Sequence, residues 1–454
     1  MMSATQPFDL GQGRELVERQ MDVFRQPPRR DEMSLEEYRR EVWDCVRCSN
    51  CKYVHPWVME EQRFSKICPS NARYLFDAYS SQGKMDIARA IIEGELDYKD
   101  SPKLLEIIYK CTLCGACDVM CKYFNDLDPL LVFEELRAKI IEDGQGPLPQ
   151  HKVIFDSVKN YDNVWMQPRA GRDRWAKDIG LKNLNKEKAD VLYFVGCTYA
   201  YKPELKMVPR ETATLLLKAG VDLGILGKKE VCCGSPIARI GDRKLFGKIA
   251  KANIEMFNQL GVSKIVTSCS GCYSTFKADY PKEGEMKFEV LHAVEYIDQL
   301  IKQGKLEFTK KLPLKVTWHD PCHLGRRSEP YIPWEGKRLK FGIYDPPKEL
   351  RRGTHGIYEP PRDILKSIPG IELIDMKRIK EYSWCCGSGG GVKSAYPDFA
   401  LWSAQERLEE AKATGAEALV TSCPWCEANF MDAIQERKEK MQLFSLVELV
   451  SQAL

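Results

Sequence analysis

The sequence predicts an α + α/β fold, in which a helical domain is followed by two repeated α/β lobes with parallel sheets. The first observation is that 18 cysteines fall into groups along 454 residues. The second is an internal repeat in the C-terminal half, where short apolar segments alternate with helical patterns and run directly into cysteines. Short apolar strands that alternate with helices are typical of parallel α/β sheets.

The composition is that of an ordinary globular protein, with 44% hydrophobic and 29% charged residues. A net charge of +3, from 68 basic and 65 acidic residues, gives no indication of nucleic-acid binding. Residues 1–10 lack the pattern of a signal peptide, and no apolar run approaches the roughly 18 residues of a transmembrane helix. We expect a cytoplasmic protein that reaches a membrane only through a partner. In that compartment cysteines favour metal or redox roles over disulfides.

Three segments precede the repeat. Residues 1–40 are polar and predict an N-terminal arm. Residues 41–130 carry the first eight cysteines, and the helical spacing of the apolar residues between them predicts a mostly helical, ferredoxin-like domain. Residues 131–189 show a helical pattern followed by polar loop signals, and we interpret them as a linker.

The first eight cysteines form two triple runs and two single residues. Three thiolates at C-x-x-C-x-x-C spacing can wrap three corners of a cubane 4Fe–4S cluster, and in two-cluster ferredoxins the fourth ligand comes from the other half. One predicted cluster therefore uses Cys45, Cys48, Cys51 and Cys121. The other uses Cys111, Cys114, Cys117 and Cys68. The alternative is zinc, but zinc needs only four tetrahedral ligands in CxxC pairs, which two complete triple runs do not suit.

The repeat divides the rest of the chain into lobe one (190–310) and lobe two (311–454). The stretch 261–272 matches 415–426 at an offset of 154 residues, and both stretches run from a glycine through an apolar strand into a CxxC pair. Ligands of parallel sheets lie at the carboxyl ends of the strands. Each lobe should present five cysteines there: Cys197, Cys232, Cys233, Cys269 and Cys272 in lobe one, and Cys322, Cys385, Cys386, Cys423 and Cys426 in lobe two.

Each five-cysteine set contains two adjacent cysteines followed by a glycine, Gly234 or Gly387. Adjacent cysteines rarely bridge each other, because the disulfide ring would be strained, but they can direct two thiolates at one metal cluster. The glycines permit positive φ and would let the backbone approach an inorganic cofactor. Lobe two also contains a longer segment, 328–357, which is either a gate or anion-docking element of an active site or a solvated surface loop.

At these motifs the sequence resembles the catalytic subunit of heterodisulfide reductase, a family with cysteine-rich CCG repeats. The resemblance is carried by His319-Asp-Pro-Cys-His-Leu-Gly-Arg326, by Tyr358-Glu-Pro-Pro-Arg362, and by Cys385-Cys-Gly-Ser-Gly-Gly-Gly-Val392. A two-cluster domain ahead of the repeats resembles the fused, membrane-partnered form of that protein. The resemblance covers residues 40–454, and the segment 328–357 departs from the family pattern.

The resemblance implies that each five-cysteine set holds a noncubane 4Fe–4S cluster. Two cubane clusters would pass electrons to them, and the chain would reduce a disulfide of the CoM-S-S-CoB type or reversibly oxidise thiols. The sequence shows no flavin or nicotinamide fingerprint. Electrons would therefore come from a flavin/iron–sulfur subunit or a membrane cytochrome.

Four side chains are candidates for supporting roles. His319 and His323 flank Cys322 and could donate protons; alternatively His319 caps a turn and His323 bonds to cluster sulfur. Arg326 and Arg327 could bind an anionic group of the substrate or cofactor; alternatively they lie on a solvated basic face. We expect His292 to be a core residue.

Two other functions compete with disulfide reduction. The chain could be an electron-relay component of a larger anaerobic complex, of the benzoyl-CoA reductase type or linked to sulfate reduction, with no substrate bound on it. It could also be a structural zinc protein, which iron content and brown colour would exclude.

Overall fold

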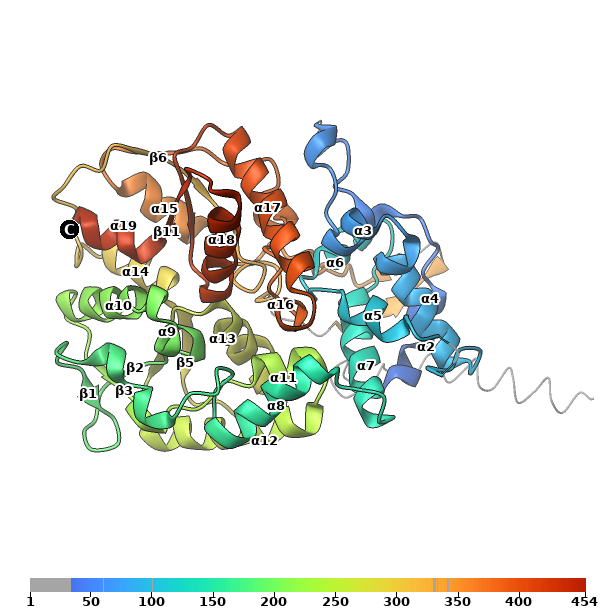
Figure 1. Cartoon of the computed structure of the whole chain (residues 1–454), viewed down its shortest axis with the longest axis horizontal. Coiled ribbons are helices and arrows are strands. Elements are labelled where there is room, and N and C mark those ends of the chain that lie inside the picture. The colour runs from blue at the N-terminus through green and yellow to red at the C-terminus, as the bar shows by residue number, and fades with distance from the viewer. Residues whose placement is uncertain (1–33, 60, 100, 330–331, 333, 341–342) are drawn as a thin grey trace, which may run out of the picture.

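The computed structural model describes residues 34–454 except 60, 100, 330–331, 333 and 341–342, so most of the predicted arm lies outside the described residues. Figure 1 shows a helical N-terminal domain beside two α/β lobes, with lobe one below lobe two. The predicted α + α/β architecture is therefore confirmed.

The N-terminal domain is built from short helices whose starts are encoded locally. They are α2 (Arg39–Trp43), α3 (Pro69–Tyr74), α4 (Ser81–Ile92), α5 (Leu104–Tyr109), α6 (Ala116–Cys121) and α7 (Pro129–Glu142). Proline is the first residue of α3 and α7, where its missing N–H costs nothing. The hydroxyl of Ser80 caps α4 by accepting from the Gly83 N–H. Met85, Leu104 and Leu136 pack in the core between them.

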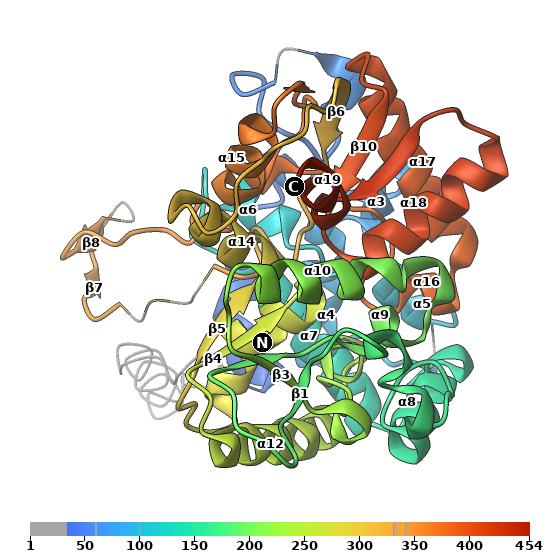
Figure 2. The ribbon, with the colours of Figure 1, turned by 90° about the vertical axis from the view of Figure 1, so that its left-hand side faces the viewer.

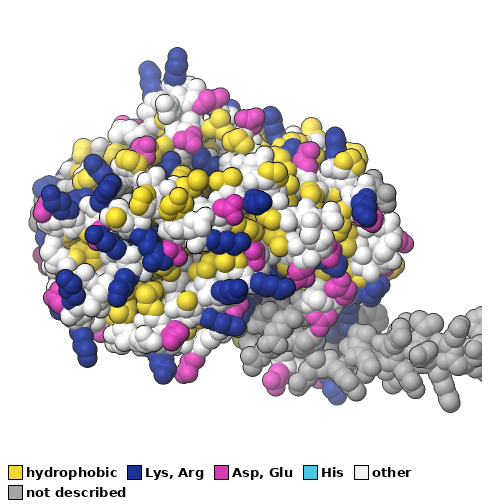
Figure 3. Space-filling model, turned by 60° about the horizontal axis from the view of Figure 1, so that its bottom comes forward, with side chains coloured by type: hydrophobic (Ala, Val, Ile, Leu, Met, Phe, Trp, Pro, Cys, Tyr) yellow, Lys and Arg dark blue, Asp and Glu magenta, His cyan; other side chains and the backbone are white. Residues whose placement is uncertain are grey.

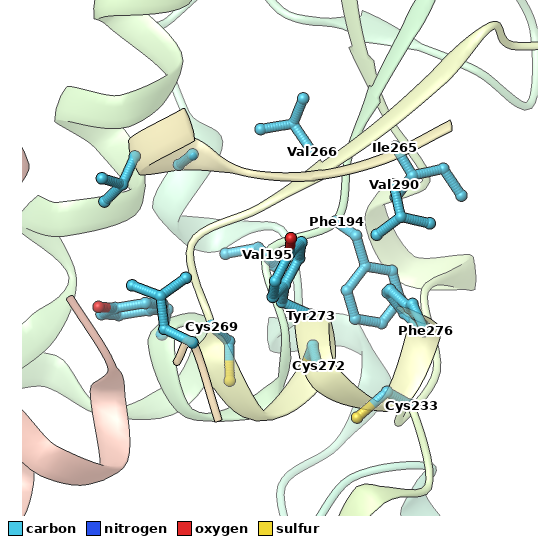
Figure 4. Close-up of a cluster of buried hydrophobic side chains, with 14 of the residues drawn as sticks. Phe194, Val195, Cys233, Ile265, Val266, Cys269, Cys272, Tyr273, Phe276 and Val290 are labelled. Carbon is cyan, nitrogen blue, oxygen red and sulfur yellow. The ribbon is translucent and has the colours of Figure 1, made fainter. Parts of the chain in front are cut away.

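Lobe one contains a parallel five-stranded sheet in the order β1-β3-β2-β4-β5. Its edge strand β1 comes from residues 131–189, so part of the segment that we interpreted as a linker belongs to this lobe. The strands are β1 (Lys182–Asn183), β2 (Val191–Tyr193), β3 (Leu223–Ile225), β4 (Lys264–Thr267) and β5 (Glu289–His292). The helices around it include α8 (Pro149–Tyr161), α10 (Met207–Lys218), α12 (Arg243–Leu260) and α14 (Ala293–Lys302). In Figure 4 the apolar side chains of Ile265, Val290 and Phe276 pack together, and the thiols of Cys233, Cys269 and Cys272 lie at the edge of this core.

Lobe two repeats the arrangement with a parallel four-stranded sheet in the order β11-β10-β6-β9. Its strands are β6 (Leu314–Trp318), β9 (Ile371–Leu373), β10 (Ala418–Thr421) and β11 (Gln442–Ser445). Its helices include α15 (Glu359–Ser367), α17 (Pro397–Ala413), α18 (Pro424–Arg437) and α19 (Leu446–Ala453). The central strands β4 and β10 are the two copies of the sequence repeat, and each leads into its CxxC pair.

Helices of the two lobes pack against each other along the boundary between them. Helix α10 of lobe one packs against α19 of lobe two, and α14 packs against α15 (Figure 2). At the cysteine end of the sheets the Ser270 hydroxyl donates to the Ser422 carbonyl at 2.8 Å. The seam therefore turns the carboxyl ends of β4 and β10 toward each other.

The segment 328–357 contains a small antiparallel ribbon, β7 (Lys337–Arg338) and β8 (Tyr344–Asp345), which projects from the molecule in Figure 2. Its described residues contact the N-terminal domain: the Tyr344 hydroxyl donates to Asp126 Oδ2 at 3.0 Å, and Arg338 lies 3.6 Å from Asp44. These contacts make it a tether between lobe two and the N-terminal domain.

The surface agrees with the near balance of charge in the sequence. On the face shown in Figure 3, Lys and Arg side chains are spread among acidic and hydrophobic ones. None of the helices in the described part of the chain is both long and apolar enough to cross a membrane.

Candidate metal centres

All ten cysteines of the two lobes line a single cavity, although they come from four strand ends and two glycine turns. Their companions on its wall include Ile154, Val164, His323 and Trp425. All ten are buried, and all 18 cysteines of the chain carry free thiols. Ten thiols facing one buried space, without a disulfide among them, form a donor set suited to soft-metal or iron–sulfur binding.

The cysteines are placed by helix starts at the carboxyl ends of the strands. Cys269 follows β4 and precedes helix α13 (Ser270–Ser274), and Cys423 follows β10 and precedes α18. Cys197 follows β2 and begins α9 (Cys197–Tyr201). A thiol at each of these positions points beyond the sheet edge, where ligands of parallel sheets bind.

The glycines after the cysteine pairs serve both the thiols and helix packing. The Gly234 N–H donates to Cys232 Sγ and the Gly387 N–H donates to Cys385 Sγ, each at 3.4 Å. At Gly387, where φ is +95°, a Cβ atom would lie 2.5 Å from the Ala400 carbonyl oxygen of α17. At Gly234, where φ is +81°, it would lie 2.9 Å from the Phe246 ring. Neither glycine lines the cavity. Gly196 also approaches a thiol, since a Cβ there would come within 3.2 Å of Cys272 Sγ, and sequence reasoning missed it.

Arg172 supports the lobe-one thiols. Its Nη1 donates to Cys197 Sγ at 3.3 Å, and its Nη2 pairs with Glu230 at 2.6 Å. Glu230 also accepts the backbone N–H groups of Val195 and Gly196. The charge of this buried guanidinium is therefore balanced by a carboxylate. Nothing in the sequence around Arg172 signals this role, because its partners lie 25 and 58 residues away.

His319 lies behind the lobe-two thiols. One ring nitrogen and the sulfurs of Cys386 and Cys426 all lie within 4.8 Å of one another. The Nε–H of Arg407 donates to His319 Nδ1 at 3.2 Å. Burial lowers the pKa of His319, so the ring is neutral and carries its proton on Nε2. The side chain does not line the cavity and does not cap a turn.

His323 is the histidine on the cavity wall. Its Nδ1 lies 3.3 Å from Cys322 Sγ. Burial, together with the charge of Arg327, lowers its pKa well below the usual value. His292 is fully buried and accepts the Val294 N–H to cap α14, so the prediction of a core residue is confirmed.

Arg326 and Arg327 are interior side chains, 3% and 6% exposed, so the interpretation as a solvated basic face is wrong. Arg326 Nε donates to the Cys114 carbonyl at 2.7 Å, and Arg327 Nη2 pairs with Glu134 at 2.7 Å. Both partners belong to the N-terminal domain. Because neither arginine lines the cavity, neither is placed to hold an anionic group of a molecule bound there.

In the N-terminal domain each single cysteine lies with the triple run of the other half. The thiols of Cys111 and Cys114 are near enough to Cys68 to act on its pKa, which burial raises to about 12. Likewise, the thiols of Cys51 and Cys45 are near enough to Cys121 to act on its pKa, and burial raises that pKa too. Cys48 is the exposed thiol of the first set.

The second set of the N-terminal domain touches both lobes. The Cys114 side chain packs in the same buried cluster as Cys322 and Cys385 of lobe two. Arg137, fully buried, donates to the carbonyls of Cys111 at 2.6 Å, Gly390 at 2.7 Å and Arg239 at 2.7 Å. One guanidinium thus fixes all three parts of the molecule around this contact.

Comparisons with known proteins agree with this arrangement. Residues 41–125 match the family described as 4Fe-4S dicluster domain, and residues 191–277 and 347–431 match the family described as Cysteine-rich domain, CCG. The fold as a whole resembles the crystal structure of a hypothetical protein from Helicobacter pylori, with a TM-score of 0.54 at 11% identity, over 97% of this chain and 76% of that one.

Curated relatives share nearly the whole chain. One component of the dihydromethanophenazine:CoB–CoM heterodisulfide reductase of Methanosarcina mazei is 32% identical over 91% of this chain and 94% of its own length. EtfAB:quinone oxidoreductase of Syntrophomonas wolfei is 27% identical over 90% of this chain and 58% of its length. One component of the fumarate reductase (CoM/CoB) of Methanothermobacter marburgensis is 27% identical over 92% and 74%. With a dicluster domain, two CCG repeats and this extent of identity, the chain belongs to the family of that heterodisulfide reductase component and is an iron–sulfur oxidoreductase.

Proposed function

We propose that this chain reduces a disulfide of the CoM-S-S-CoB type, or oxidises the two thiols in the reverse direction, inside the cavity between its lobes. The observation that carries the proposal is that two complete five-cysteine sets face the same space. A site that only passes electrons onward needs neither two such sets nor a shared cavity between them.

The donor sets fit four clusters. Cys45, Cys48, Cys51 and Cys121 would hold one cubane cluster, and Cys111, Cys114, Cys117 and Cys68 the other. The five-cysteine sets of lobe one and lobe two would each hold a noncubane 4Fe–4S cluster. Bound there, the clusters would supply single electrons and iron sites that accept sulfur.

Residues of the chain itself would line the substrate cavity and supply a proton to the product sulfur. The apolar side chains of Ile154, Val164 and Trp425 form part of the cavity wall and make that part unfavourable for water. His323 is the candidate proton donor to a product thiolate, because it lies on that wall beside Cys322. Burial keeps the resting ring neutral, so it would take up the proton it transfers when negative charge develops on the product sulfur. We do not assign this role to His319: its Nδ1 accepts from Arg407, and its Nε2 is buried, without a hydrogen-bond partner among the described residues, while the ring lies within 4.8 Å of the Cys386 and Cys426 sulfurs.

The electrons would come from another protein, either a flavin/iron–sulfur subunit or a membrane cytochrome. The Methanosarcina mazei relative is named for dihydromethanophenazine as the reductant. The exposed Cys48 places the first N-terminal set nearest the surface, so a partner would dock there. On this proposal the chain works in the cytoplasm, at the membrane where the partner is a cytochrome.

The test is turnover with a reduced viologen as the electron donor. Anaerobic, iron-loaded protein should oxidise the viologen when CoM-S-S-CoB is added, and His323→Phe should slow this by about 100-fold, the usual contribution of a general acid. The matched control is His55→Phe, because His55 stacks on Trp57 in the N-terminal domain and does not line the cavity; this variant should retain activity. Failure with every disulfide tried, while the clusters still accept electrons, would favour the electron-relay function.

A further inference from the structure

Arg326 has a free N–H at the junction between the N-terminal domain and lobe two. Its Nε donates to the Cys114 carbonyl at 2.7 Å, and its Nη1 donates to the carbonyls of Glu381 and Ser383 at 2.9 and 2.7 Å. Its Nη2 is buried and has no hydrogen-bond partner among the residues described. A buried donor without a partner is costly and indicates that a group belonging to the site completes it.

The charge of Arg326 is also unbalanced. No carboxylate in the described ranges lies within ion-pair distance of its guanidinium, which is only 3% exposed. Thiols surround it instead: Cys114 of the N-terminal domain, and Cys322 and Cys385 of lobe two, act on its pKa. A buried cation requires a nearby negative charge. Here the sources are the Glu381 carboxylate, which lies beyond ion-pair distance, and whatever these sulfurs hold.

In lobe one, the arginine near the cysteines has a carboxylate partner. The position four residues after the first cysteine is Arg326 in lobe two and Tyr201 in lobe one. The guanidinium near the lobe-one thiols is Arg172, and Glu230 neutralises it at 2.6 Å. One set therefore lies beside a balanced ion pair and the other beside an unbalanced cation.

We propose that Arg326 donates its free Nη2 hydrogen to sulfur at the contact between Cys114 and Cys385, and thereby makes lobe two the first of the two lobes to receive an electron from the N-terminal domain. The inference rests on the cluster assignment in the proposed function. A cation and an N–H donor both stabilise the more negative, reduced state of a cluster. The step moves one electron, supplied by the partner, and makes or breaks no bond.

The neighbouring segment holds Arg326 in this position. A Cβ atom at Gly353, where φ is +78°, would lie 2.5 Å from Arg326 Cβ. The Tyr358 hydroxyl donates to the Gly353 carbonyl at 2.7 Å and fixes that backbone. Gly353→Ala therefore displaces the guanidinium without removing its charge, which gives a second way to test the same contact.

The experiment is a redox titration of the full-length, iron-loaded protein followed by EPR. In Arg326→Met, the components at the Cys114 set and the lobe-two set should shift to more negative potential, leaving lobe two about tenfold less reduced at a fixed potential, as expected for loss of one charge-assisted hydrogen bond. Arg326→Lys keeps the charge and should recover most of the shift. Arg172→Met is the matched control and should move a different component, that of lobe one.

Gly353→Ala should reproduce the direction of the Arg326→Met shift. Iron content per chain is measured for each variant, and where Arg326→Met binds less iron, Gly353→Ala carries the comparison. Unchanged potentials in Arg326→Met or Gly353→Ala at full iron content, or a shift of the component that Arg172→Met moves, would overturn the proposal. The redox titration needs no disulfide, so it tests this inference separately from the proposed function. If the wild-type protein reduces no disulfide but the variants show the expected shifts in potential, the proposed function is refuted and this inference stands.

Discussion

The Nε–H of Arg407 donates a hydrogen bond to Nδ1 of His319 at 3.2 Å and so directs the Nε2 proton of that ring toward the lobe-two thiols. Arg407 is itself fixed by Glu410 at 2.6 Å and by the Arg378 carbonyl at 2.9 Å. In the lobe-one repeat Phe194 stands at the position of His319, and Asn253 at that of Arg407. Only lobe two has this donor behind its cysteine pair.

His319→Phe, which copies lobe one, should lower the reduction potential of the lobe-two component, because hydrogen bonds to cluster sulfurs raise it. EPR-monitored redox titration measures the shift. His319→Gln can still present an N–H and should restore part of it. Equal potentials in the wild type and His319→Phe would show that the ring is only a packing residue.

We predict that each cubane cluster of the N-terminal domain takes its fourth cysteine from the other half of the domain. Serine variants test this assignment. Cys68→Ser should remove the same EPR component as Cys111→Ser, because Cys68 lies beside Cys111 and Cys114. Cys121→Ser should match Cys45→Ser. Each variant should lose roughly four iron atoms per chain, one cubane cluster. A Cys68→Ser spectrum that matches Cys45→Ser would contradict the assignment.

Arg137→Met should destabilise the assembled chain. It leaves three buried carbonyls, those of Cys111, Gly390 and Arg239, without their donor, at a cost of about 3 kcal/mol or more. The expected result is a lower urea midpoint for the iron-loaded protein. Lys315→Ala is the control: it breaks an exposed pair with Glu372 and should change the midpoint little. Similar midpoints for both variants would mean that Arg137 does not join the three parts.

Stability should fall as pH rises from about 4.5 to about 7, in part because of Glu211. Burial, aided by the charge of Glu448, raises the pKa of Glu211 to about 7. The folded state therefore holds this proton more tightly than the unfolded state, and its stabilisation is lost as pH rises through that window. Partial exposure reduces the effect to about 1 kcal/mol. Glu211→Gln should flatten the urea midpoint between these pH values, whereas an unchanged slope would exclude Glu211.

The repeat could be predicted from the sequence because the residues that define it are adjacent in the chain. A glycine, an apolar strand and a CxxC pair occur together in 261–272 and again in 415–426, so β4 and β10 and their thiols could be predicted from the sequence. The triple runs of the N-terminal domain are equally local.

The supporting contacts could not be read in this way, because each joins residues far apart in the chain. Arg326 reaches a carbonyl 212 residues away, and Arg137 reaches one 253 residues away. An arginine in such a contact has no local pattern that distinguishes it from a surface cation, which is why Arg326 and Arg327 were open to interpretation as a solvated face. The packing role of Gly387 was missed for the same reason, since the helix that requires it, α17, begins ten residues later.

The most direct test of the central claim is EPR of the oxidised, anaerobically purified protein, recorded with and without coenzyme M. If the cavity between the lobes binds substrate sulfur, a new paramagnetic signal should appear only with the thiol, and it should be lost in Cys322→Ser. Ordinary reduced-cubane signals that stay the same with every thiol tried would contradict disulfide chemistry on this chain and assign it to electron relay.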